Sequence, residues 1–308
     1  MDIISAIVLG AVQGLTEFLP VSSSGHLVLL QKVFGISEPA LLFDTMLHMG
    51  TLLAVLVVLR RDILAILRRI IQPLTGFLIL ATIPAVVAAL VFEDHIEAAF
   101  DSGRFLGFSF LLTSALLVIA ELLSKRKTTE DTEEKPRSTT EEEEIKIKLC
   151  ETPCSPWLKK ITTKSKTAGD MNALDALIIG VLQAVAIIPG VSRSGATISG
   201  ALSRGLDRDF AARFSFLLSI PAILGALVFQ LKDLLTANVA VSTDGGIAVG
   251  ISPLAIASGT VVAAIVGFFA IRLMLKIVRE RSLFGFAIYT AVLGALVIVD
   301  QFATHFVF

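Results

Sequence analysis

The sequence predicts an all-α polytopic membrane protein built as an inverted-topology repeat, in which each half has one re-entrant helical hairpin and three transmembrane helices. Three observations lead to this fold class. The 308 residues are 55% hydrophobic and only 17% charged, and their mean hydropathy of +0.82 lies outside the usual range of water-soluble domains. Apolar stretches of spanning length recur along the chain. A stretch near the N-terminus is repeated, without a gap, 170 residues later.

Six apolar stretches are each close to the ~20 residues that a membrane-spanning helix needs. Three of them precede a charged segment in the middle of the chain and three follow it. They cover residues 41–59, 75–92, 105–123, 213–230, 253–274 and 284–303. Because each half crosses the membrane an odd number of times, the second half is expected to enter it upside down relative to the first.

Two further apolar segments, residues 3–30 and 173–203, are each interrupted in the middle by proline, glycine and a polar cluster. Within lipid such a break leaves backbone groups unpaired, so it is tolerated only where the chain is buried in protein or lines a wet cavity. Both segments are therefore predicted to be re-entrant helical hairpins rather than straight spans. One enters from each side, which brings the two broken tips together near the middle of the membrane.

The two hairpins are also copies of one another, since "AIVLGAVQGLTEFLPVSSSG" (6–25) aligns with "ALIIGVLQAVAIIPGVSRSG" (176–195). Membrane composition alone accounts for most of the apolar matches, but it does not account for the shared V-S-x-S-G. We infer an internal duplication. The identical pairs are Ala6/Ala176, Gly10/Gly180, Gln13/Gln183, Val21/Val191, Ser22/Ser192, Ser24/Ser194 and Gly25/Gly195.

A charged segment, residues 124–170, separates the first repeat (1–123) from the second (171–308). The chain has 26 Lys and Arg and 27 Asp and Glu, and eleven of the basic and ten of the acidic residues lie in this segment. It cannot bury enough apolar surface to form a core, so it is predicted to be a solvated, disordered insertion. Its cysteines, Cys150 and Cys154, are interpreted as ordinary thiols, with a disulfide or a pair of zinc ligands as alternatives.

The basic residues of the loops predict how the chain is oriented. Arginine and lysine gather after the first span, in the insertion, before the fourth span and after the fifth, so by the positive-inside rule these loops, with the insertion 124–170, face the cytoplasm. We therefore expect a multi-pass protein of the cell (plasma) membrane, in contact with the bilayer. The formal net charge of −1 provides no basic footprint, so no nucleic-acid partner is expected.

The side chains capable of chemistry lie at the two hairpin tips. They are Ser22, Ser23, Ser24 and His26 at the first tip and Ser192, Arg193, Ser194 and Thr197 at the second. Polar groups at membrane depth are expensive unless they bind a polar ligand or one another. An arginine with hydroxyls and backbone N–H groups at a helix start predicts a site for a phosphate-type anion. For the serines, close packing of helices is the alternative.

The first copy of the duplication has a carboxylate and an imidazole that the second copy lacks, since Ile187 stands opposite Glu17 and Ala196 opposite His26. A carboxylate, a histidine and a serine are the groups that proton transfer and nucleophilic attack require. Glu17, Ser23 and His26 are therefore predicted catalytic residues, alongside the arginine of the second tip.

Two pairs of residues spaced four apart add to this set. Gln13 precedes Glu17 by one helical turn and lies on the same helix face. Asp44 and His48 repeat that spacing inside the first span. Ionisable groups inside a membrane are functional candidates by default, so Asp44 and His48 are secondary candidates for the same site.

Two long motifs, "QGLTEFLPVSSSGH" (13–26) and "PGVSRSGAT" (189–197), closely resemble the signature regions of the undecaprenyl-diphosphate phosphatase family, also called the bacitracin-resistance protein family. The resemblance extends to "FDTMLHMGTLLAV" and "FSFLLSIPAILGA", so it covers both halves of the chain. It leaves out the segment 124–170, which is longer and more charged than the linker expected of that family.

This resemblance implies an integral membrane phosphohydrolase that removes the terminal phosphate of undecaprenyl diphosphate, a polyprenyl diphosphate lipid, and so recycles the carrier for cell-wall and surface glycan synthesis. It implies catalytic roles for Glu17, Ser23, His26 and Arg193. It also implies a divalent cation, Mg²⁺ or Ca²⁺, with Glu17 as its one strong metal ligand because Gln13 is not a carboxylate. The predicted phosphate-binding residues are Gln13, Ser22, Ser24, Ser192, Ser194 and Thr197.

From the residues alone, the rival function is an inverted-repeat transporter or flippase for a lipid phosphate or a small anion. The acid, imidazole and serine opposite an arginine favour the hydrolase, because a carrier needs the cation but has less use for the rest. The sequence leaves open whether Ser23 is a covalent nucleophile or positions water, and whether the protein is a homodimer. The outward entry of the first hairpin predicts that the lipid reaches the site from the outer leaflet.

Overall fold

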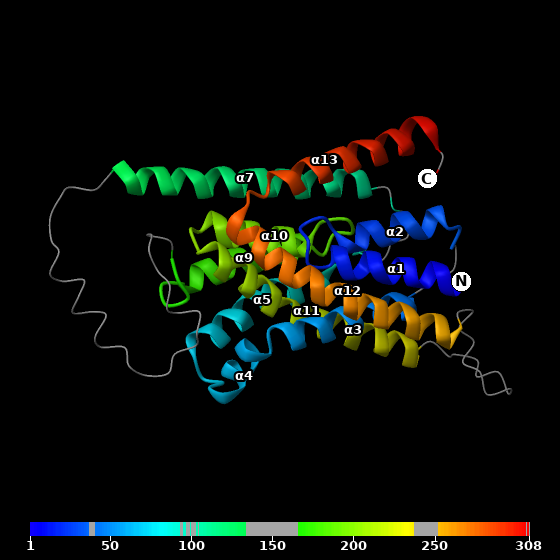
Figure 1. Ribbon diagram of the computed structural model, residues 1–308, viewed down its shortest axis with the longest axis horizontal. Coiled ribbons are helices and arrows are strands. Elements are labelled where there is room, and N and C mark those ends of the chain that lie inside the picture. Colours follow the sequence, from blue (N-terminus) through cyan, green and yellow to red (C-terminus); the bar gives the residue numbers. More distant parts are fainter. Residues whose placement is uncertain are drawn as a thin grey trace.

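The computed structural model describes residues 1–36, 41–92, 95–96, 99, 103, 105–133, 166–236, 252–305 and 307. Over these residues the chain is helical, with one isolated bridge between Lys166 and Leu206 and no strand, which confirms the predicted all-α class. The helices (Figure 1) are α1 (Ile3–Thr16), α2 (Ser23–Val33), α3 (Leu41–Val58), α4 (Arg60–Arg68), α5 (Pro73–Val91), α7 (Leu106–Glu133), α9 (Ala173–Val185), α10 (Arg193–Ser203), α11 (Arg208–Thr236), α12 (Pro253–Glu280), α13 (Phe284–Val299) and the π-helix η2 (Asp300–Thr304).

Five helices, α5, α7, α11, α12 and α13, are long and apolar enough to cross a membrane. Helix α3 passes the same test together with α4, from which it is separated by a bend of 75°. All six predicted spans thus fall on helices, and the chain is a multi-pass membrane protein. Helix α7 is longer than predicted, because it continues to Glu133 and makes residues 124–133 helical where disorder was expected. The predicted insertion from residue 134 to 165, with Cys150 and Cys154, lies outside the described residues.

The two predicted hairpins are each a pair of short helices joined by a break. Helices α1 and α2 flank residues 17–22, and α9 and α10 flank residues 186–192. With 11 to 14 residues, each helix rises only about 17–21 Å, less than the ~30 Å of a bilayer core. In Figure 1 the first pair lies in the half of the molecule near both termini and the second pair lies in the opposite half, so the two breaks meet between them.

The two breaks touch each other directly. Ser194 Oγ donates to the carbonyl of Leu19 at 2.9 Å, and Ser24 Oγ accepts from the backbone N–H of Gly190 at 3.4 Å. Gly190 has a φ of 86°, and a Cβ at this position would lie 2.7 Å from the side chain of Leu106. Only glycine fits both the turn and the close contact, so this residue allows the tips to approach.

The first helix of each hairpin packs closely against a long helix. Helix α1 packs against α12, while α9, its counterpart in the duplication, packs against α5. Both contacts use the equivalent glycines. A Cβ on Gly10 would collide with the carbonyl of Gly259, and one on Gly180 would come 2.6 Å from the carbonyl of Ala81. The backbones of each pair therefore lie in direct contact, as small residues allow in membrane helices.

Buried ion pairs fasten the end of the bundle that holds α4. Arg208, at the start of α11, donates to both oxygens of Glu121 on α7, at 3.3 and 3.1 Å. Arg213, also on α11, donates to Asp62 on α4 at 3.0 Å. Glu121 and Asp62 are only 2% and 7% exposed, so each carboxylate depends on its arginine. These pairs hold α7 and α4 of the first half to α11 of the second.

Candidate active site

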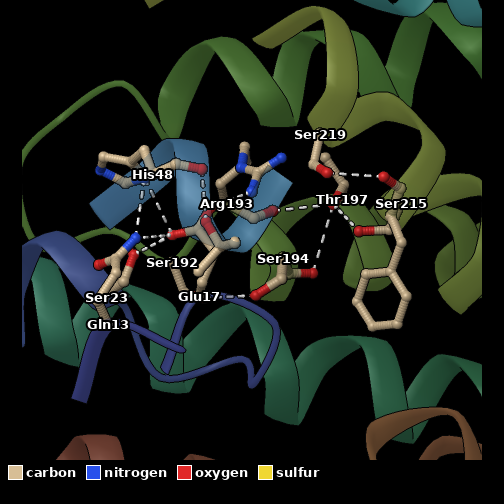
Figure 2. A network of polar contacts seen from close by, with 12 residues as sticks. Gln13, Glu17, Ser23, His48, Ser192, Arg193, Ser194, Thr197, Ser215 and Ser219 are labelled. Atoms are coloured by element: carbon tan, nitrogen blue, oxygen red, sulfur yellow. Dashed lines mark hydrogen bonds and ion pairs between the residues drawn. The ribbon is translucent and has the colours of Figure 1, made fainter. Parts of the chain in front are cut away.

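Glu17 lies where the two breaks meet. It is the C-cap of α1 and is 6% exposed. Its Oε2 accepts hydrogen bonds from Ser23 Oγ at 2.6 Å and from Gln13 Nε2 at 3.0 Å, and its Oε1 pairs with Arg193 Nη2. Figure 2 shows this carboxylate between the side chains of the first hairpin and the arginine of the second. Glu17 therefore joins the two tips.

Ser23 and Arg193 are the first residues of α2 and α10 and occupy the same position in the two copies of the repeat. In each copy the preceding serine caps the helix, because its Oγ accepts from the N–H three residues on, at 3.2 Å for Ser22 and 3.0 Å for Ser192. The start of a helix carries a partial positive charge. Two helix starts and a guanidinium thus converge at the tips, which is an arrangement that attracts an anion.

The backbone of the first tip is strained and that of the second is not. Ser22 has φ 71° and ψ 101°, whereas Ser192 has φ −72° and ψ 115°. A non-glycine residue in such a conformation costs about 1–3 kcal/mol, so other contacts must hold it. The carbonyl of Ser22 accepts from His26 Nδ1 at 2.6 Å, and His26 Nε2 lies 2.7 Å from the Tyr289 hydroxyl. These contacts anchor the strained turn to α13.

His26 consequently lies outside the Glu17 cluster, that is, Glu17 with the side chains of Gln13, Ser23 and Arg193 that contact it. A carbonyl can only accept, so Nδ1 carries the ring proton and donates to Ser22, while Nε2 accepts from Tyr289. The rings of His26 and Tyr289 are stacked with an interplanar angle of 8°. Among the contacts of the described residues, His26 makes none with Ser23 or Glu17. Tyr289 was not predicted from the sequence, because this partner lies 263 residues away on another helix.

The imidazole beside Glu17 is that of His48, on α3. His48 Nδ1 lies 2.9 Å from Gln13 Nε2 and 3.6 Å from Glu17 Oε2. An amide nitrogen can only donate, so Nδ1 accepts and the neutral ring carries its proton on Nε2. The other secondary candidate, Asp44, lies apart from this group, since it accepts from Gln31 of α2 at 2.8 Å and so ties α2 to α3.

The hydroxyls of the second tip are bonded within the protein. Thr197 Oγ1 donates to the carbonyl of Arg193 at 2.8 Å and lies 2.6 Å from Ser215 Oγ on α11. Ser192 donates its N–H to Thr113 Oγ1 at 3.0 Å. Figure 2 shows Thr197 and Ser215 on the opposite side of Arg193 from Gln13 and His48. These contacts position α10, and two of the partners, Thr113 and Ser215, were not predicted from the sequence.

Few side chains near Glu17 could bind a divalent cation. The described residues contain no group of three or more acidic, histidine or cysteine side chains that could hold a metal ion. Gln13 Oε1, one helical turn from the carboxylate, is buried and has no hydrogen-bond partner among the described residues. Mg²⁺ is commonly held by one or two carboxylates together with substrate phosphates. Glu17 and Gln13 carry the side-chain oxygens at the two breaks that are suited to a cation of this kind.

Comparison with known proteins relates this chain to one family. The family model of bacitracin resistance protein BacA matches residues 6–296. Relatives named undecaprenyl-diphosphatase come from Carboxydothermus hydrogenoformans (41% identical over 307 residues, 99% of this chain and 100% of the relative) and Halothermothrix orenii (36% over 301 residues, 97% and 98%). A relative named undecaprenyl-diphosphatase 4, from Bacillus thuringiensis subsp. konkukian, is 38% identical over 306 residues (99% and 100%).

Proposed function

Because the chain belongs to the bacitracin resistance protein BacA family, we infer that it is an undecaprenyl-diphosphatase, a membrane hydrolase that removes the terminal phosphate of undecaprenyl diphosphate. The products are inorganic phosphate and undecaprenyl monophosphate, so the enzyme recycles the lipid carrier of cell-wall and surface glycan synthesis. The observation that carries this function is the buried cluster at the two tips, where a serine hydroxyl and an arginine contact the same carboxylate.

We propose that the two halves are inverted repeats of one unit. The matching contacts of Gly10 with α12 and of Gly180 with α5 support a shared internal packing. The arginine-rich α4 and the C-terminal end of α7 lie toward the same end of the bundle (Figure 1), which by the positive-inside rule faces the cytoplasm of the cell. In this orientation the first hairpin enters from the outside, and the substrate lipid reaches the tips from the outer leaflet.

The terminal phosphate of the substrate is assigned to Arg193 and to the starts of α2 and α10. A guanidinium can bind two phosphate oxygens at once, and the backbone N–H groups of two helix starts add further donors. Arg193 is 19% exposed at its side chain, so it is accessible to a ligand while much of its charge is shielded from water. Stabilising the charge that spreads over the phosphoryl oxygens is the main requirement of phosphoryl transfer.

Ser23 and Glu17 are assigned to the bond-breaking step. The Ser23 hydroxyl donates to Glu17, so the carboxylate is placed to take its proton as Oγ attacks phosphorus. The bond from phosphorus to the bridging oxygen then breaks, the lipid monophosphate leaves, and water releases phosphate from the serine. If Ser23 instead orients a water molecule, the water oxygen attacks phosphorus while Glu17 takes its proton. Inorganic phosphate and the lipid monophosphate then form in one step. The geometry at Glu17 serves both routes.

His48 is assigned the proton-transfer role that the sequence suggested for His26. Its accepting nitrogen lies close to Glu17 Oε2, whereas both nitrogens of His26 are engaged elsewhere. Glu17 and Gln13 are the residues that would hold a divalent cation, Mg²⁺ or Ca²⁺. Such an ion, when bound, neutralises part of the diphosphate charge.

Phosphate release by the purified protein in detergent tests this function against the transporter. We expect phosphate release from both farnesyl and undecaprenyl diphosphate, with a higher rate when Mg²⁺ or Ca²⁺ is present. A carrier would bind its lipid phosphate without cleaving it, since transport does not require a serine that is hydrogen-bonded to a carboxylate. Folded protein that moves a lipid phosphate across vesicles but releases no phosphate with any cation would contradict the hydrolase.

A further inference from the structure

Helix α4 is amphipathic and does not follow the direction of the spans. It turns away from α3 by 75° and is followed by a short connection to α5. One face of the helix contacts the protein: Asp62 is 7% exposed and paired with Arg213, and Ile63 and Ile66 pack against the main core. The remaining two faces of α4 are exposed.

One exposed face is apolar. Leu64 and Leu67, three residues apart on one side of the helix, are 49% and 61% exposed. Ile70 and Ile71, in the connection that follows, are 64% and 100% exposed. Side chains of this size and exposure are stable in contact with acyl chains, so this face lies where lipid begins.

The other exposed face is basic. Arg61 and Arg68, two helical turns apart, share one side of α4, and Arg69 follows them as the C-cap of the helix. Arg60 lies on the leucine side, one helical turn before Leu64. All four are exposed, and none forms an ion pair with a described acidic residue. A row of free arginines beside a row of exposed leucines is the pattern of a helix that lies in the membrane interface.

We propose that α4 is a binding site for anionic phospholipid of the leaflet it faces, with the arginines on the lipid headgroups and the leucines among the upper acyl chains. The ligand must carry both negative charge and apolar chains, because an acidic peptide would leave Leu64 and Leu67 in water. Helix α4 continues α3, which carries His48, and Asp62 binds α11. Lipid binding at α4 therefore holds in place the C-terminal end of α3, the helix that carries His48.

The test measures how strongly spin-labelled phosphatidylglycerol, compared with spin-labelled phosphatidylcholine, associates with the full-length protein in phosphatidylcholine vesicles. Wild type is compared with the Arg61→Gln/Arg68→Gln variant and with Arg279→Gln/Arg281→Gln, the matched control from the C-terminal end of α12. One arginine near a charged surface contributes about fivefold to lipid association, so we expect the preference to fall several-fold in the α4 variant only, and less at high salt.

An unchanged preference in the α4 variant, or an equal loss in the control variant, would overturn the proposal. The melting temperature of each variant in detergent serves as the check on folding, because Arg61, Arg68, Arg279 and Arg281 are all exposed. If the difference in phosphatidylglycerol preference between wild type and the α4 variant is as large at high salt as at low salt, its cause is a change of shape rather than the lost charge. That result would also overturn the proposal. The measurement uses no substrate, so its result is independent of the proposed hydrolysis.

Discussion

The carboxylate of Glu17 is contacted by four side chains, those of Gln13, Ser23, His48 and Arg193. Gln13, Ser23 and Arg193 donate to it, and a buried charge is stable only while its donors remain, so each of these three has a structural part as well as a chemical one. The activity of each variant of these residues is therefore measured together with its melting temperature.

Replacing Ser23 by alanine separates the serine's chemistry from that of its neighbours. If Ser23 Oγ is the nucleophile, Ser23→Ala lowers kcat by about 10²–10⁴-fold and removes the phosphoserine trapped by rapid acid quench. Ser24→Ala is the matched control, since within the described part of the chain the Ser24 Oγ has hydrogen-bond contacts only with Ser22 and the Gly190 N–H, both at 3.4 Å. Full turnover by Ser23→Ala would rule out the covalent route and leave the water route.

His48 and His26 are distinguished by kinetics and stability measured together. His48→Gln should lower kcat by about 10²-fold with little change in the melting temperature, because the ring accepts protons beside Glu17. Tyr289→Phe, which removes only the hydroxyl that His26 accepts from, should cost about 1 kcal/mol of stability and leave kcat within a few-fold. The reverse pattern, with turnover lost in Tyr289→Phe and kept in His48→Gln, would return the proton-transfer role to His26.

At the scale of elements, the duplication made the hairpins predictable, because V-S-x-S-G in both copies marks where each helix begins. The residues at Ser22 and Ser192 do cap those helices. The rotation of side chains at the tips was not predictable. His26 was expected beside Ser23, but a bond back to its own helix and a stacked tyrosine from α13 turn it away. Contacts between distant helices leave no local pattern in the sequence.

The close contacts of α1 with α12 and of α9 with α5 lead to a prediction about stability. Gly10→Ala places a methyl group against the carbonyl of Gly259, and Gly180→Ala places one against that of Ala81, so each should cost about 1–3 kcal/mol. Gly225→Ala, in α11, is the control, since no atom of the residues that the structure describes lies within 4 Å of the added Cβ. Melting temperatures in detergent measure the difference. Equal stability of Gly10→Ala and Gly225→Ala would contradict the direct backbone contact.

At the scale of the molecule, the site exists only because two distant parts of the chain meet. The first half supplies Glu17, Ser23 and His48, and the second supplies Arg193. The six apolar stretches and the two breaks could be predicted because each follows from hydrophobicity along a short window. The buried ion pair of Glu121 with Arg208 could not be predicted, since it depends on how α7 and α11 pack.

The most direct test of this composite site is phosphate release from undecaprenyl diphosphate by Arg193→Ala, compared with wild type and with Arg272→Ala. Arg272 is the matched control, because it lies on α12 over the ring of Phe268 and is exposed. The account predicts that Arg193→Ala loses about 10²–10³-fold in kcat/KM, as expected for one charge-stabilising donor, while Arg272→Ala stays within a few-fold of wild type. Turnover by Arg193→Ala close to that of wild type would contradict the placement of the terminal phosphate between the two hairpin tips.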